Sequence, residues 1–155
     1  MAEAATRLAP QSTADRTLVI ERTFNAPPER VFAAWTEPEM LAKWWGPEGA
    51  KLPGALMEFR VGGRYRTAMT GPDGNAHIVS GTYREIVPPR KLVFTWGWEE
   101  DGKRGYETEV TVVLEPAGKG TKMRFVQEVF ASAEMMQGHQ MGWDASFKLL
   151  DKALA

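Results

Sequence analysis

The chain has 155 residues, with 19 basic and 20 acidic side chains, a formal net charge of −1 and no cysteine. This length suits one domain that buries enough surface to be stable by itself. Without cysteine, the chain can form neither disulfides nor cysteine-ligated metal sites. The near-zero net charge argues against the broad electrostatic attraction that nucleic-acid binders show, so we expect no nucleic-acid partner.

The N-terminal segment carries few apolar side chains that a fold could bury. Residues 1–15 are rich in Ala, Thr and Ser, and we expect a flexible tail there and a single domain over residues 16–155. Neither the apolar core of a signal peptide nor an apolar run of membrane-spanning length is present. We therefore expect a cytoplasmic protein that does not insert into a membrane.

A first strand and two short helices are predicted at the start of the domain. Alternating, partly β-branched residues predict a strand over 17–24. Two prolines then interrupt the extended pattern and open a helix. A second short helix, between Thr36 and Gly46, carries Trp44 and Trp45 on its apolar face.

The central part of the chain has the pattern of an antiparallel meander. Apolar and polar residues alternate with a period of two, and turn sequences rich in Gly, Pro and Asp recur at hairpin spacing. Together with the first strand, these segments predict a curved antiparallel sheet of about seven strands. The six predicted strands span residues 55–60, 64–70, 76–87, 92–98, 107–115 and 121–130.

A long helix is predicted at the C-terminal end. From Ser132 the apolar period becomes 3.6, and Met136, Trp143 and Phe147 fall on one face. A helix of about twenty residues is roughly 30 Å long, enough to cross a small domain. The order of elements predicts an α+β helix-grip fold, in which the sheet curves around this helix.

Alternation along the strands also predicts which side chains face the helix. Around Gly81 the alternation stays open, because a glycine inside a strand can mark a bulge that reverses it. The predicted inward set is Phe94, Trp96 and Trp98; Val110, Val112 and Leu114; Met123, Phe125 and Gln127; and Tyr65, Thr67 and Met69.

Large aromatic and methionine side chains gather toward the open end of this sheet, which favours an adaptable apolar pocket. For each of them ordinary core packing is the alternative, since aromatic residues dominate cores. Gln127 and His139 are candidate polar contacts. The candidate lining of the pocket is Trp44, Trp45, Phe59, Tyr65, Met69, Trp96, Trp98, Phe125, Gln127, Met136, His139 and Trp143.

The sequence offers little for metal or covalent chemistry. The two histidines, His77 and His139, are far apart and lack a carboxylate at motif spacing, so we expect no metal site and no cofactor. No recognisable nucleophile setting is present, and we assign no catalytic residue.

Four polar residues could face the pocket, namely Glu58, Arg66, His77 and Glu85. An inward carboxylate could have a raised pKa and act as a general acid or base. The alternative is that Glu58 forms an ion pair at the rim with Arg60 or Arg66, which would contribute little. Alternation by itself leaves their direction open.

Several segments together carry a family resemblance. They are residues 58–64 (Glu-Phe-Arg-Val-Gly-Gly-Arg), 69–74, 81–89, 92–96, 120–121 and 142–143. In this order and spacing, over about residues 17–154, they resemble the SRPBCC or START-like superfamily and, within it, the AHSA-type domain named after the activator of the Hsp90 ATPase. The resemblance implies a helix-grip fold with a hydrophobic cavity between the sheet and the terminal helix.

Three functions are compatible with this resemblance, because the superfamily includes lipid and steroid carriers, hormone sensors, polyketide cyclases and oxygenase subunits. The leading hypothesis is a non-enzymatic carrier or sensor of a hydrophobic small molecule. The alternatives are a cofactor-free enzyme of the cyclase or dehydratase type and a stress- or chaperone-related interaction module. Eukaryotic co-chaperones of this name have a further N-terminal domain where this chain has a short tail, so we do not expect a chaperone partner. The resemblance is compatible with a homodimer.

Overall fold

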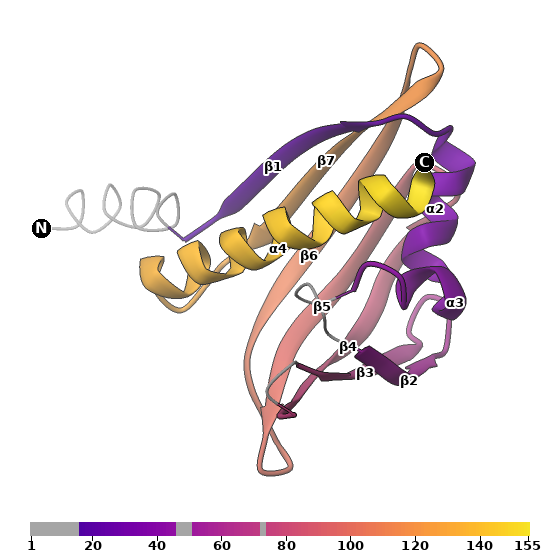
Figure 1. The fold of residues 1–155 in the computed structure, drawn as a ribbon. Coiled ribbons are helices and arrows are strands. Elements are labelled where there is room, and N and C mark those ends of the chain that lie inside the picture. Colours follow the sequence, from indigo (N-terminus) through magenta and orange to yellow (C-terminus); the bar gives the residue numbers. More distant parts are fainter. Residues whose placement is uncertain (1–15, 46–50, 72–73) are drawn as a thin grey trace, which may run out of the picture.

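The computed structural model describes residues 16–45, 51–71 and 74–155, so the predicted tail over residues 1–15 lies outside the described residues. The predicted α+β helix-grip fold is confirmed (Figure 1). In chain order the elements are β1 (Leu18–Phe24), α2 (Pro28–Thr36), α3 (Pro38–Leu41), β2 (Lys51–Met57), β3 (Arg64–Thr70), β4 (Ala76–Val87), β5 (Lys91–Glu100), β6 (Lys103–Ala117), β7 (Gly120–Glu128) and α4 (Ala133–Leu154).

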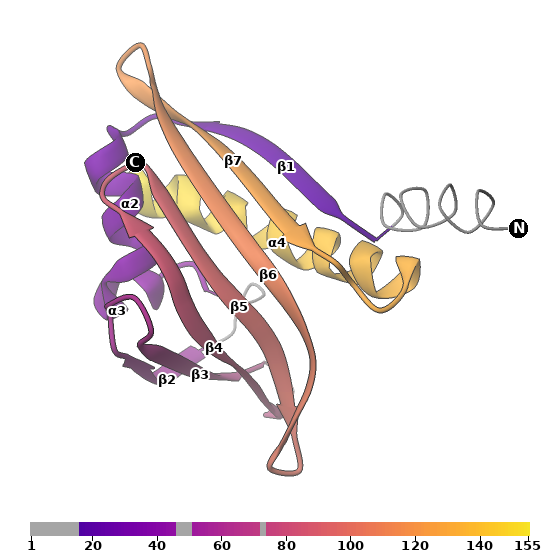
Figure 2. The ribbon, with the colours of Figure 1, turned by 180° about the vertical axis from the view of Figure 1, so that it is seen from behind.

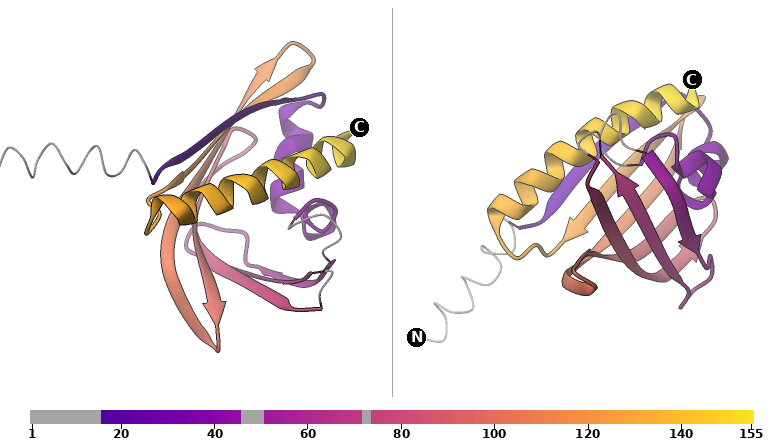
Figure 3. Two further views of the ribbon diagram at one scale, coloured as in Figure 1. Left: turned by 60° about the vertical axis from the view of Figure 1, so that its left-hand side comes forward. Right: turned by 60° about the horizontal axis from the view of Figure 1, so that its bottom comes forward.

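The seven strands form one antiparallel sheet in the order β1-β7-β6-β5-β4-β3-β2. Strands β2 to β7 pair with their neighbours in the chain, whereas β1 pairs with β7 from Leu18↔Gln127 to Phe24↔Thr121. Seen from behind, β4 to β7 lie across α4 (Figure 2). The sheet bends around the helix, as two further views show (Figure 3).

Some predicted boundaries were wrong by several residues. Strand β2 ends at Met57 instead of residue 60, because Glu58 bonds back to Arg64 through two contacts and starts a turn. Strands β5 and β6 extend to Glu100 and from Lys103, since Asp101 and Gly102 adopt positive φ values of 52° and 76° and close a tight hairpin. Helix α3 is one turn long, ending at Leu41.

Gly81 does not reverse the alternation of β4. Val79, Gly81 and Tyr83 are all buried on the concave side, and the register shift against β5 comes later, between Tyr83 and Glu85. A Cβ atom at Gly81 would lie 1.9 Å from the Thr95 carbonyl oxygen and 2.7 Å from Cε2 of Tyr65. Glycine is therefore required here by close packing.

The core lies between the concave face and the helices. All twelve residues of the predicted inward set point inward, eleven of them buried and Trp98 half-buried. From α4 the buried residues Trp143, Phe147, Leu150 and Leu154 pack against them. Ser132 begins the helix by accepting a hydrogen bond from the Met135 backbone N–H.

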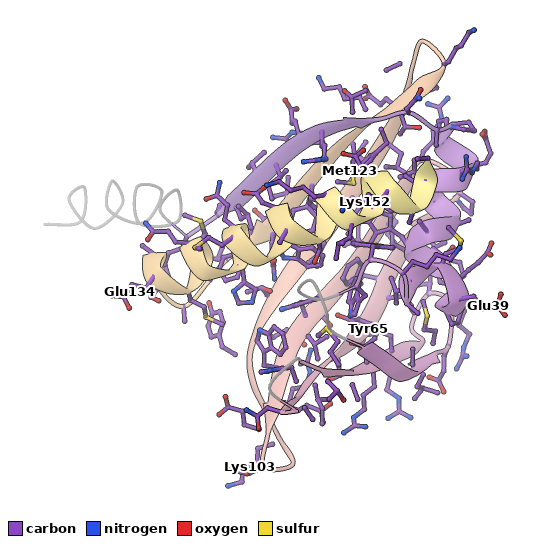
Figure 4. The ribbon with its side chains drawn as sticks, viewed as in Figure 1. Glu39, Tyr65, Lys103, Met123, Glu134 and Lys152 are labelled. Carbon is purple, nitrogen blue, oxygen red and sulfur yellow. The ribbon has the colours of Figure 1, made fainter. Side chains whose placement is uncertain are left out.

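Helix α4 is also attached to β1 by an ion pair, because the Arg22 guanidinium donates to the Asp151 carboxylate at 2.6 Å. Lys152 near the end of α4 lies close to Met123 of β7 in projection, while Glu134 marks the opposite end of the helix (Figure 4). Within the described residues, no helix combines the length and apolar character that crossing a membrane requires.

Candidate functional site

A cavity of about 450 Å³ opens between the sheet and the N-terminal half of α4. Strands β3, β4 and β5, the segment after α3 and helix α4 all contribute to its wall. Four of the lining residues are tryptophans and two are methionines. The described lining residues are Trp45, Met69, His77, Trp96, Trp98, Met135, Gly138, His139, Gly142, Trp143 and Ser146.

Hydrogen bonds fix three of the four lining indoles. The ring N–H of Trp45 donates to the Thr67 hydroxyl at 3.0 Å. The Trp98 ring N–H donates to Nε2 of His139 at 2.9 Å, and that of Trp143 to the Gln127 side-chain oxygen at 2.8 Å. Because each ring has a fixed partner, these walls of the cavity are formed before any ligand arrives.

Trp96 is the exception among these indoles. Its ring is packed against Trp45, Trp98 and Trp143 with centroid distances of 5.6, 5.5 and 5.0 Å. Its Nε1 is buried and has no hydrogen-bond partner among the described residues. Most buried polar groups in proteins are paired, so this donor is an energetic cost at the cavity wall.

Gln127 lies behind the wall, fully buried on β7. It accepts from Trp143 and donates its side-chain N–H to the Thr108 hydroxyl at 2.8 Å. The sequence predicts Gln127 as a polar contact for a ligand. In the structure its amide is engaged by Trp143 and Thr108 and it orients the Trp143 indole.

His139 is held as a neutral ring. Since Nε2 accepts from Trp98, the proton is on Nδ1, which donates to the Met135 carbonyl at 2.9 Å. Burial lowers the pKa of His139 from its ordinary value of 6.5, because the charged form would lose hydration. Both ring nitrogens are thus used by the protein, and the neutral ring has no further N–H to offer a ligand.

Of the four polar residues that could face the pocket, three form ion pairs away from it. Glu58 pairs with Arg64, and not with Arg60 or Arg66. A hydrogen bond from the Arg64 backbone N–H is the main cause of the lowered pKa of Glu58. Arg66 pairs with Glu99, and Glu85 with Lys91. None of these groups is among the described residues that line the cavity, whereas the exposed His77 is.

Six of the twelve residues in the predicted lining surround the cavity: Trp45, Met69, Trp96, Trp98, His139 and Trp143. The other six lie elsewhere in the described fold. Trp44 and Phe125 are buried in the core, Tyr65 lines a separate hollow of about 20 Å³, and Phe59 packs on Phe32 and Tyr83 at the surface. Gln127 lies behind Trp143, and Met136 packs on the core.

Sequence reasoning missed four lining residues on α4, namely Met135, Gly138, Gly142 and Ser146. Together with His139 they follow helical spacing, so they share a face. The sequence prediction named Met136 as a lining residue, whereas the structure has Met135 there. The predicted cavity-facing side of α4 was therefore rotated by one residue. Glycine and serine gave no apolar signal at all, which is why the pattern of large side chains could not reveal them.

The described residues contain no cluster of three or more His, Asp or Glu side chains that could hold a metal ion. The lining offers large aromatic surfaces and thioethers. The ring nitrogens of Trp45, Trp98, His139 and Trp143 are paired within the protein, whereas Nε1 of Trp96 has no partner among the described residues. Such a lining suits binding of apolar molecules.

The chain shows a clear family relationship. Residues 25–155 match the family model described as "Activator of Hsp90 ATPase homolog 1-like protein", or AHSA1. The chain belongs to this family. The resemblance predicted from the sequence, to the AHSA-type domain of the SRPBCC superfamily, is thereby confirmed. No curated protein matches the chain.

Several solved structures share the fold. The crystal structure of the AHSA1 protein from Silicibacter pomeroyi is 33% identical, with a TM-score of 0.82, and the match covers 89% of this chain and 96% of that one. A protein from Chromobacterium violaceum is 32% identical with a TM-score of 0.82, covering 90% and 96%. A solution structure from Arthrobacter aurescens is 31% identical with a TM-score of 0.81, covering 92% and 87%.

Proposed function

We propose that this protein binds an uncharged apolar small molecule in the cavity between the sheet and α4, as a carrier or sensor. The observation that carries the proposal is the composition of the cavity wall: four tryptophans, two methionines and no Asp, Glu, Lys or Arg among the described lining residues. A volume of about 450 Å³ lies within the range of roughly 300–1,000 Å³ found for small-molecule sites.

Binding would be driven by the removal of apolar surface from water, at roughly 25 cal/mol per Å². The rigid positions of Trp45, Trp98 and Trp143 support this, since a preformed wall loses little side-chain entropy when a ligand enters. We place this activity in the cytoplasm, in keeping with a chain that has no cysteine.

Native mass spectrometry of freshly purified protein tests the proposal first. A defined small molecule that leaves on unfolding supports it and identifies a starting ligand. A titration with N-phenyl-1-naphthylamine, whose emission rises in apolar surroundings, then measures binding to emptied protein. Saturation at one molecule per chain is the expected result.

Two neighbouring methionines give a matched pair of variants for this titration. Met135 lines the cavity and Met136 does not, although both are half-buried on α4. Met135→Trp fills part of the cavity and should weaken binding of the probe, whereas Met136→Trp should leave it close to wild type. Protein that carries no small molecule and also ignores the probe would contradict the proposal.

A further inference from the structure

The cavity-facing side of α4 carries two glycines one turn apart. Gly138 and Gly142 both line the cavity, and residues four apart lie one above the other on a helix. A Cβ atom added at either position would meet no heavy atom within 4 Å from the rest of the described chain, outside its own stretch of helix. Close packing therefore does not require glycine here, and alanine would fit at both positions.

A glycine inside a helix lowers the stability of the fold relative to alanine, unless close packing or a positive φ requires it. It loses more conformational freedom on folding than any other residue, and it is a poorer helix former than alanine. Both glycines are well inside α4, which runs from Ala133 to Leu154. What they supply is a strip of helix without side chains, against which a ligand can approach the backbone.

The aromatic part of the wall comes from Trp96 and Trp98 on β5 and from Trp143 on α4. The rings of Trp96 and Trp98 meet edge to face, with centroids 5.5 Å apart at an angle of 88°. Trp143 lies 5.0 Å from Trp96. Such rings favour other aromatic groups, which can stack on their faces or meet them with an edge.

The described lining disfavours charge in the ligand. It contains no carboxylate, ammonium or guanidinium group, and His139 is held neutral by its two hydrogen bonds. A charged group that entered would lose its hydration, and the one other ionisable side chain in the described lining is His77, which is exposed. The favoured ligand is therefore uncharged.

We propose that Gly138 and Gly142 determine the specificity of this cavity for flat, uncharged aromatic ring systems, which lie between the glycine strip of α4 and the indoles of Trp96 and Trp98. This inference rests on the proposed binding function and narrows its ligand class. A flat ring fits against the helix surface where Gly138 and Gly142 have no Cβ atoms, whereas a puckered saturated ring of the same carbon number is thicker. Side chains at these two positions would occupy the space of the ring.

Competition against N-phenyl-1-naphthylamine tests the shape and charge of the ligand with the full chain. Naphthalene and decalin share one carbon skeleton but are flat and puckered, and 2-naphthoate adds a negative charge to the flat ring. We expect naphthalene to displace the probe at concentrations about tenfold lower than decalin or 2-naphthoate, the scale of discrimination that apolar pockets reach for small changes.

Variants of the glycine strip test the residues. Gly138→Leu and Gly142→Leu add side chains that project into the cavity and should weaken naphthalene binding about tenfold or more. Gln140→Leu is the matched control, since Gln140 is exposed on the same helix and is not among the described lining residues. Gly138→Ala and Gly142→Ala add one methyl group each. They should weaken binding while the thermal midpoint of unfolding rises, because alanine is the better helix former.

The outcomes separate this inference from the function on which it rests. If wild-type protein binds neither the probe nor any competitor, the proposed function is wrong and the inference falls with it. If the probe binds but decalin or 2-naphthoate competes as well as naphthalene, binding stands and the ligand class is wrong. If folded glycine variants keep wild-type affinity, the role of Gly138 and Gly142 is wrong.

Discussion

The ring N–H of Trp98 on β5 donates to Nε2 of His139 on α4 over 2.9 Å, joining the sheet to the helix at the cavity. The bond exists only while Nε2 is unprotonated, because a protonated nitrogen cannot accept. The other ring nitrogen, Nδ1, already carries a proton and donates it to the Met135 carbonyl. A second proton on His139 must therefore go to Nε2, where it breaks the hydrogen bond from Trp98. The stability of the fold near the cavity should therefore depend on pH.

We predict that the free energy of unfolding falls as the pH is lowered below about 6.5. Burial lowers the pKa of His139 from 6.5 in the folded state, so between the two values the unfolded chain binds more protons. The stabilisation is fully present above pH 6.5 and is lost progressively as the pH falls toward the folded-state pKa. Urea denaturation at closely spaced pH values measures this slope.

In the variant His139→Gln, the free energy of unfolding should depend less on pH between 6.5 and the lower folded-state pKa of His139. His77→Gln is the control, since it removes the other histidine of the chain and leaves the Trp98 bond intact. An equal slope in wild type and His139→Gln would contradict the role assigned to His139.

Gln127→Leu should destabilise the protein by about 1–3 kcal/mol, the usual cost of leaving buried polar groups without a partner. The change removes the acceptor of the Trp143 ring N–H and the donor to Thr108, both buried. Gln140→Leu, at an exposed position on α4, should change the stability little.

A double-mutant cycle checks the cause of that loss. Trp143→Phe should cost less in the Gln127→Leu background than in the wild type, because the unpaired N–H is then removed with the ring. Strict additivity of the two changes in urea denaturation would show that Gln127 does not act through Trp143.

Gly81→Ala should cost about 3 kcal/mol or more, or prevent folding, since overpacking against backbone atoms cannot be relieved by a rotamer change. The new Cβ would clash with the Thr95 carbonyl and with Tyr65. Gly105→Ala is the matched control, because its Cβ would meet only the Trp98 carbonyl oxygen at an ordinary 3.5 Å. The midpoints of thermal unfolding of the two variants, monitored by circular dichroism, give the comparison. Similar midpoints for the two variants would overturn the packing argument.

The Arg22–Asp151 pair should show a coupling energy of about 0.5–1 kcal/mol, near the upper end for accessible ion pairs. Its atoms approach to 2.6 Å across β1 and α4. The pair Glu21–Arg124, on the opposite face of β1, is separated by 3.6 Å and is more exposed, so its coupling should be smaller. Double-mutant cycles in urea give both values. A stronger coupling for Glu21–Arg124 would contradict the attachment of α4 through Arg22.

The sequence predicted the elements and the direction of most side chains, because both depend on local periodicity. A period of two along β5 placed Phe94, Trp96 and Trp98 on one face, and the structure places all three inward. The long terminal helix followed equally from the spacing of Trp143 and Phe147. These inferences need only the backbone geometry of a strand or a helix.

Only the tertiary structure decided what surrounds the cavity. Strand β1 pairs with β7, and Trp98 on β5 bonds to His139 on α4, so both contacts join distant segments of the chain. The rotation of α4 about its axis, which turns Met135 and not Met136 toward the cavity, also depends on such contacts. Gly138 and Gly142 form part of the wall through the absence of a side chain, which no hydrophobic pattern records. The amino-acid sequence by itself thus determined the fold and its inward faces, because periodicity is local. The shape of the cavity was decided by how the helix seats on the sheet, because that depends on packing between residues far apart in sequence.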